Sequence, residues 1–118
     1  MDQLVFPSDY QAFVFKSRYA RYLAERGRRE HFVDTVQRYC GFMMDHVETH
    51  LEAQLPPKTF DMLFNGIFDL DVMPSMRAMM TAGPALARDN TAGYNCAFLR
   101  VDHPKAFSEA MRILLCGT

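Results

Sequence analysis

The sequence predicts an α/β fold in which several helices lead into one strand and a last helix. Apolar residues make up 49% of the 118-residue chain, which is enough for the core of one ordinary domain. Apolar positions recur at steps of three or four over two long stretches, as in amphipathic helices. A short aromatic and apolar run near residue 95 precedes a last helical pattern, and a strand followed by a helix is the opening half of a βαβ unit.

The helical part occupies the first two thirds of the chain. A short helix is expected over residues 10–23, and Gly27 breaks it. The clearest helix is expected over residues 29–52, and Pro56-Pro57 separates it from a second helix over residues 58–70. The apolar stripe of the clearest helix consists of Phe32, Val33, Val36, Tyr39, Cys40, Met43, Val47 and Leu51. Met73-Pro74-Ser75 ends the second helix, because a residue before proline avoids the α region.

The last third changes character. Residues 77–93 are expected to be irregular, residues 94–101 to form a buried strand, and a final helix to start at His103-Pro104. A single strand cannot satisfy its own backbone groups and needs ladder partners. We therefore expect a helical region over residues 1–72 and the start of a larger α/β unit, truncated in this chain, over residues 73–118.

Charge and cysteine content limit the possible partners. The net charge is −1, but the segment KSRYARYLAERGRR (residues 16–29) is basic and could face phosphates, although such runs are more often solvated surfaces or mates of acidic ones. We expect no nucleic-acid partner. No stretch is long and apolar enough for a membrane span and no secretory signal is evident, so a cytoplasmic location is expected. Three cysteines give no disulfide framework or zinc pattern.

Individual reactive side chains have ordinary structural explanations at this level. Cys40 lies on the stripe of the clearest helix and Cys116 on the apolar side of the last helix, so both are expected to be structural. His46 and His50 are four residues apart, a spacing that can bind metal, but no third ligand is evident and a surface pair is favoured. From residue statistics alone, Cys96 is also a buried apolar residue.

Three blocks in order resemble the N-terminal region of the large catalytic chain of ribonucleotide reductases. They are SRYARYLAERGRREHFVDTVQRYCGF, MPSMRAMMTAGPALARDNTAGYNCAFLRV and AFSEAMRILLCGT. The closest resemblance is to the adenosylcobalamin-dependent (class II) type, and a class I large subunit is the competitor. The resemblance implies N-terminal helices that lead into the first strand and helix of a ten-stranded α/β barrel, incomplete in this chain.

The resemblance also implies roles for particular residues. Cys96 would be one of two thiols that reduce the ribose at C2′ and become a disulfide, which thioredoxin or a similar reductant restores. Ser75 would contact substrate phosphates, and Asn95 would lie in the substrate pocket. Arg77 receives no role.

The rest of the family's machinery would lie outside this chain. The radical cysteine, the second redox cysteine and the parts that contact adenosylcobalamin, or a metal-containing radical-generating small subunit, would belong to other polypeptide. We expect the chain alone to be inactive, after a split gene, an intein or a truncated reading. Whether the substrate is a ribonucleoside diphosphate or triphosphate stays open. The competing hypothesis is a non-enzymatic helical module that binds phosphates or an acidic partner through residues 16–29.

Overall fold

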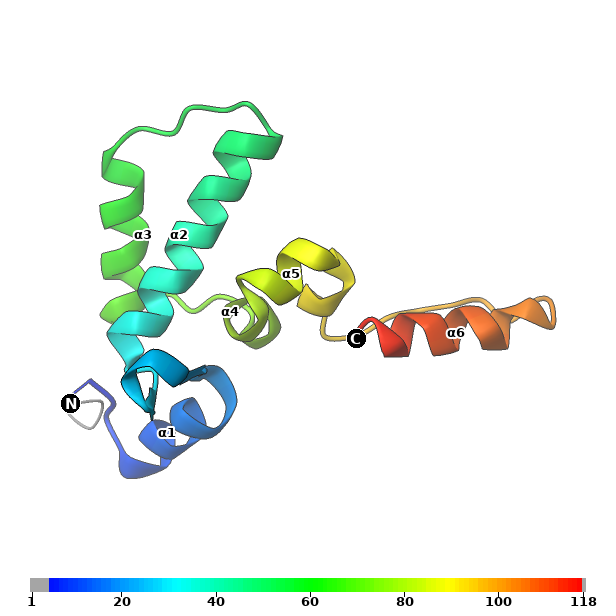
Figure 1. Ribbon diagram of the computed structural model, residues 1–118, viewed down its shortest axis with the longest axis horizontal. Helices are drawn as coiled ribbons and strands as arrows, with labels where there is room; N and C mark the ends of the chain where they lie inside the picture. Colours follow the sequence, from blue (N-terminus) through cyan, green and yellow to red (C-terminus); the bar gives the residue numbers. More distant parts are fainter. Residues whose placement is uncertain (1–4, 118) are drawn as a thin grey trace.

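The computed structural model describes residues 5–117, which form a helix-rich chain with a two-stranded sheet. Figure 1 shows three parts: a pair of long helices, α2 and α3, standing side by side; a short helix α1 with a hairpin at their base; and an arm made of an extended segment and α6. Two short helices, α4 and α5, connect the base to the arm. The described residues contain no barrel, so the ten-stranded barrel stays a prediction.

The chain begins with a helix that is shorter than expected. Helix α1 (Asp9–Val14) starts at Ser8, whose hydroxyl accepts the backbone N–H of Gln11 at 3.3 Å. A single π-helical turn, η2 (Phe15–Tyr19), follows it, closed by a 3.1 Å bond from the Ala20 N–H to the Phe15 carbonyl. The predicted helix over residues 10–23 is therefore correct only in its first part.

A small hairpin replaces the end of that predicted helix. Strands β1 (Tyr22–Leu23) and β2 (Arg28–Arg29) pair antiparallel and are joined by the 3₁₀ turn η3 (Ala24–Arg26) and Gly27. Gly27 has φ +59°, a left-handed conformation that glycine adopts without strain. The glycine therefore closes a β-turn and does not simply end a helix.

The two long helices agree with the sequence periodicity. Helix α2 (Phe32–His50) and helix α3 (Lys58–Phe68) start and end within a few residues of their predicted bounds. Helix α2 opens with a capping box, in which the Asp34 carboxylate accepts the His31 backbone N–H at 3.0 Å.

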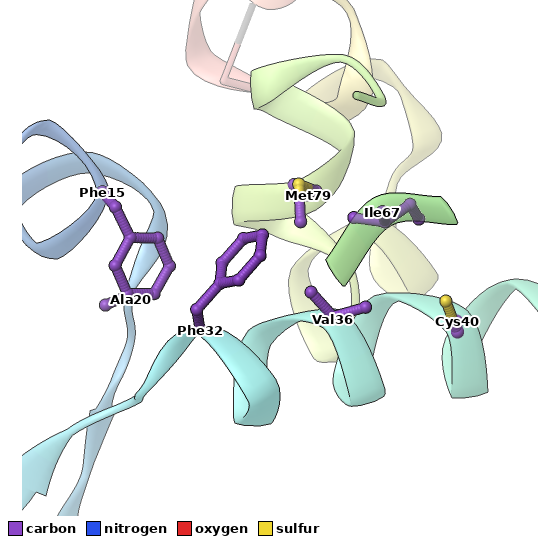
Figure 2. Close-up of a cluster of buried hydrophobic side chains, with 7 residues drawn as sticks. All are labelled: Phe15, Ala20, Phe32, Val36, Cys40, Ile67 and Met79. Carbon is purple, nitrogen blue, oxygen red and sulfur yellow. The ribbon is translucent and has the colours of Figure 1, made fainter. Parts of the chain in front are cut away.

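The core lies where α2, α3, η2 and α4 (Met76–Thr81) meet. Figure 2 shows its side chains converging from these elements: Phe15, Ala20, Phe32, Val36, Cys40, Ile67 and Met79. Cys40 is 1% exposed, so its predicted place in the core is confirmed. Met79 is completely buried in the same cluster, which fixes α4 against the long helices.

The irregular region predicted over residues 77–93 contains more helix than expected. Helix α4 is followed by α5 (Pro84–Arg88) and the 3₁₀ turn η4 (Asn90–Gly93). Gly83 separates the two helices with φ +125°. At Gly93 an added Cβ would lie 2.8 Å from Cδ1 of Leu86, so the Leu86 side chain would have to move to make room for it.

The predicted strand over residues 94–101 is wrong for this chain. Within the described residues the segment has no strand partner, and none of its N–H groups from residue 95 to 101 donates to a backbone carbonyl. It runs outward as an extended segment, and α6 (Lys105–Leu115) returns beside it (Figure 1). Strand formation needs a hydrogen-bonded ladder, and residues 5–117 offer this segment no partner strand.

Candidate functional site

Asn95 and Cys96 lie together on the extended segment, in a groove beside α6. The groove has a volume of about 330 Å³, and its walls are Asn95, Cys96, Ala97, Leu99, Ala110, Ile113 and Leu114. Cys96 is exposed, which contradicts the expectation of a buried thiol. Among the described residues no strand pairs with this segment, and the thiol is open to solvent. A mainly apolar groove with an accessible thiol can present that sulfur to another molecule.

Ser75 lies elsewhere, at the start of α4. It is the N-cap residue of that helix, it is exposed, and its hydroxyl makes no capping hydrogen bond. Ser75 is not among the residues that line the groove of Cys96, so the described residues do not bring the three predicted site residues together. Arg77, the second residue of α4, donates to the Gly117 carbonyl at 2.9 Å and so connects α4 with the end of α6.

Cys116 caps the end of α6 and contacts the turn before η4. Its side chain is half-buried and hydrogen-bonds Asp89, which raises the pKa of the Cys116 thiol above its ordinary value. Asp89 itself accepts the Thr91 backbone N–H at 2.9 Å, and this bond is the main reason why the pKa of Asp89 is lowered. The Cys116 contact anchors the base of the arm, in agreement with a structural role.

A buried ion pair, which the sequence analysis missed, connects the hairpin, α2 and α4. Glu30 is 2% exposed, and Arg38 donates to both of its oxygens, at 2.8 Å from Nε to Oε1 and 3.0 Å from Nη2 to Oε2. Thr35 donates its hydroxyl to Oε2 at 2.8 Å, and the Arg21 backbone N–H donates to the same oxygen at 3.2 Å. Burial raises the pKa of Glu30, but these hydrogen bonds outweigh it, so the net pKa is lowered.

The same arginines reach the carboxyl end of α4. Arg38 Nη1 donates to the carbonyls of Met79 and Ala82, each at 2.8 Å, and Arg21 Nε donates to the Met80 carbonyl at 2.8 Å. The last carbonyls of a helix have no intrahelical partners, and a cation near them also interacts favourably with the helix dipole. The only sequence signal for this contact is the presence of Glu30, Arg38 and Arg21 in one block of the resemblance.

Cations of the basic segment are largely engaged inside the molecule. Lys16 donates to the Glu30 carbonyl at 2.8 Å, and Arg29 donates to the Ala20 carbonyl at 3.0 Å. Arg28 pairs with Asp34 at 3.0 Å. Arg21 also donates to a carbonyl of α4. These contacts indicate that residues 16–29 form a folded hairpin and not an open face that binds phosphates.

The histidine pair lies on the exposed face of α2. The rings of His46 and His50 stack with centroids 4.4 Å apart. Among residues 5–117 no group of three or more His, Cys, Asp or Glu side chains is placed to hold a metal ion. The described helices include none that is long and apolar enough to cross a membrane.

A family model described as "Ribonucleotide reductase alpha domain" matches residues 2–84, more than half of the chain. This chain belongs to the ribonucleotide reductase alpha family. No curated protein and no solved structure matches it. Reductases of this family are oxidoreductases of deoxyribonucleotide synthesis. Membership of the family is consistent with this chain being part of a larger catalytic chain. The matched residues include Ser75 and the Glu30–Arg38 pair, whereas Asn95 and Cys96 lie beyond them.

Proposed function

We propose that this chain is the N-terminal part of a ribonucleotide reductase catalytic polypeptide and contributes one redox thiol, Cys96. The observation that carries the proposal is the family match over residues 2–84. The open thiol in the groove beside α6 supports it, because a cysteine that reacts with a substrate and then with a reductant must be reachable. The reaction would take place in the reducing cytoplasm.

The chemistry proposed for Cys96 is a two-electron reduction. After a thiyl radical on another cysteine has activated the ribose, the C2′–O bond breaks and the hydroxyl leaves as water. Cys96 and a second thiol together supply two electrons and two protons: one hydrogen ends on C2′, one in the water, and the two sulfurs form a disulfide. Thioredoxin or a similar dithiol then reduces that disulfide and becomes oxidised itself.

The remainder of the catalytic chain is the proposed partner of the arm. Large apolar side chains are exposed on both of its elements: Tyr94, Phe98, Val101, Phe107, Met111, Leu114 and Leu115. Phe98 is 92% exposed and Leu115 is 80% exposed, and such a cluster of exposed apolar side chains is typical of an interaction surface. A neighbouring strand would pair with the backbone of residues 95–101 and cover these side chains. Residues 73–118 would then form the start of the catalytic barrel.

Substrate and cofactor complete the proposal. Ser75 would bind substrate phosphates through its unpaired hydroxyl, and Asn95 would bind the substrate beside the thiol. Adenosylcobalamin would generate the radical in a class II enzyme, and a metal-containing small subunit would do so in class I. The parts of the enzyme that would contact either radical source would lie in other polypeptide.

The test is an activity assay on the assembled enzyme. This chain is combined with the downstream catalytic polypeptide, and deoxyribonucleotide formation is measured with thioredoxin, with adenosylcobalamin or the small subunit as the radical source. We expect turnover that depends on thioredoxin, loss of turnover in Cys96→Ser and its retention in Cys116→Ser. Full activity of Cys96→Ser would remove this sulfur from the mechanism.

A further inference from the structure

Helix α4 is held at its carboxyl end by two arginines from the N-terminal part of the chain. Arg38 bonds the Met79 and Ala82 carbonyls, and Arg21 bonds the Met80 carbonyl. Met79 is also completely buried in the core. Contacts at these three carbonyls and at the buried Met79 side chain therefore leave this end of α4 little freedom to rotate or slide.

The Arg38 guanidinium is itself held in place by Glu30. Its other guanidinium donors form the two-point contact with Glu30, whose carboxylate is further held by Thr35 and the Arg21 N–H. An arginine bound on both sides has lost most of its conformational freedom, so its carbonyl contacts need little further ordering. Lysine has no planar fork and cannot reproduce the contacts to Glu30 and both carbonyls at once.

The opposite end of α4 carries Ser75. The helix has six residues, and the Met79 N–H donates to the Ser75 carbonyl at 3.0 Å. With a rise of about 1.5 Å per residue, Ser75 lies roughly 6–10 Å along the axis from the clamped carbonyls. A displacement of the carboxyl end by one ångström would therefore be passed to Ser75 almost undiminished.

We infer that Arg38, held by Glu30, is a positioning residue for the substrate-phosphate turn at Ser75. This inference rests on the proposed function, because it gives the clamp a task only if Ser75 binds substrate. Arg38 does not touch the substrate in this account. It sets the place of Ser75 through the backbone of α4, and Arg21 supports it through one further carbonyl.

The test separates positioning from folding by measuring KM and kcat independently in the assembled reductase. Loss of folded protein lowers the apparent kcat but leaves KM unchanged, whereas a displaced phosphate turn raises KM. We expect Arg38→Lys to raise the KM for ribonucleotide about 10- to 100-fold, in line with the effect of an ångström-scale misplacement. Arg21→Lys, which loses one carbonyl contact, should raise KM by a smaller factor and serves if Arg38→Lys does not fold.

The matched control is Asp34→Asn. Asp34 caps α2 and pairs with Arg28 in the same hairpin region, but within the described residues its carboxylate makes no hydrogen bond or ion pair with α4. The substitution should therefore lower stability and leave KM unchanged. An unchanged KM in both arginine variants would overturn the positioning role while leaving the reductase activity intact. An inactive wild-type assembly would instead overturn the proposed function, and the positioning role with it.

Discussion

Replacing Glu30 by Gln tests the central contact of the fold. Glu30 is 2% exposed and the Arg38 side chain is 18% exposed, so the substitution leaves a mostly buried guanidinium without its counter-charge. Breaking a buried pair by removing one partner destabilises proteins by about 3–5 kcal/mol. Glutamine keeps one acceptor oxygen for Arg38 or Thr35, so we expect a loss just below this range, about 2–3 kcal/mol.

The same substitution has a defined pH dependence. The folded-state pKa of Glu30 is lowered from its ordinary value of 4.5. A depressed carboxylate pKa contributes stability that is present above the unfolded-state pKa and is lost as the pH falls through the folded-state value. The stability difference between wild type and Glu30→Gln should therefore be full at pH 7 and shrink progressively below pH 4.5.

The assay is urea unfolding followed by circular dichroism at pH 7 and at pH 3–4. With a slope of about 2 kcal/mol per molar urea, the variant's midpoint should fall by roughly 1–1.5 M at pH 7. The control is Asp102→Asn, since Asp102 and Arg100 form an exposed pair at 3.5 Å that should contribute less than about 0.5 kcal/mol. Equal midpoints for Glu30→Gln and wild type at pH 7 would refute the reasoning.

Three further predictions concern the core, the η4 turn and the thiols. Met79→Ala should lower the free energy of unfolding by about 2–5 kcal/mol in the same urea assay, because it leaves a cavity in the core, and a loss below 1 kcal/mol would show that α4 is loosely packed. Gly93→Ala should lower the free energy of unfolding by only about 0.5–1 kcal/mol, because its Cβ would lie 2.8 Å from Cδ1 of Leu86 and that side chain can move. In a Leu86→Ala background the same substitution should cost less, and equal costs in both backgrounds would argue against this clash. In the folded isolated chain, iodoacetamide should label the exposed Cys96 well before the buried Cys40, as followed by mass spectrometry. Equal labelling rates of the two thiols would contradict the described core.

The parts of the fold that depend on local pattern were predictable. The stripes over α2 and α3 gave nearly correct bounds, and Cys40 was placed in the core because it falls on the α2 stripe. Amphipathic periodicity reports directly which helix face is buried. The last helix was recognised for the same reason, with Pro104 at its start.

The parts that depend on distant partners were not predictable from one sequence. The extended segment around Cys96 has the residue composition of a buried strand, but a strand exists only where a neighbour pairs with it, and the described residues contain none. Glu30 follows directly after the basic segment 16–29, and no role was predicted for it from the sequence. It is buried beside Arg38, which also bonds two carbonyls 41 and 44 residues further along the chain, at the carboxyl end of α4. No local pattern encodes this contact.

The candidate site divides along the same line. Asn95 and Cys96 are neighbours in sequence and share a groove, so their proximity was assured. Ser75 lies outside that groove, at the start of α4, and Arg77 of the same helix contacts the end of α6 through the Gly117 carbonyl. Residue types could suggest its chemistry but not its distance from the thiol.

The fate of the Cys96 sulfur in a single turnover tests the central claim most directly. The assembled enzyme is given ribonucleotide and its radical source without thioredoxin, and free thiols are then alkylated and located by mass spectrometry. The account predicts that deoxyribonucleotide forms in stoichiometric amount while Cys96 becomes resistant to alkylation, and that added dithiol restores its labelling. Product formation with Cys96 still fully alkylated would contradict the account.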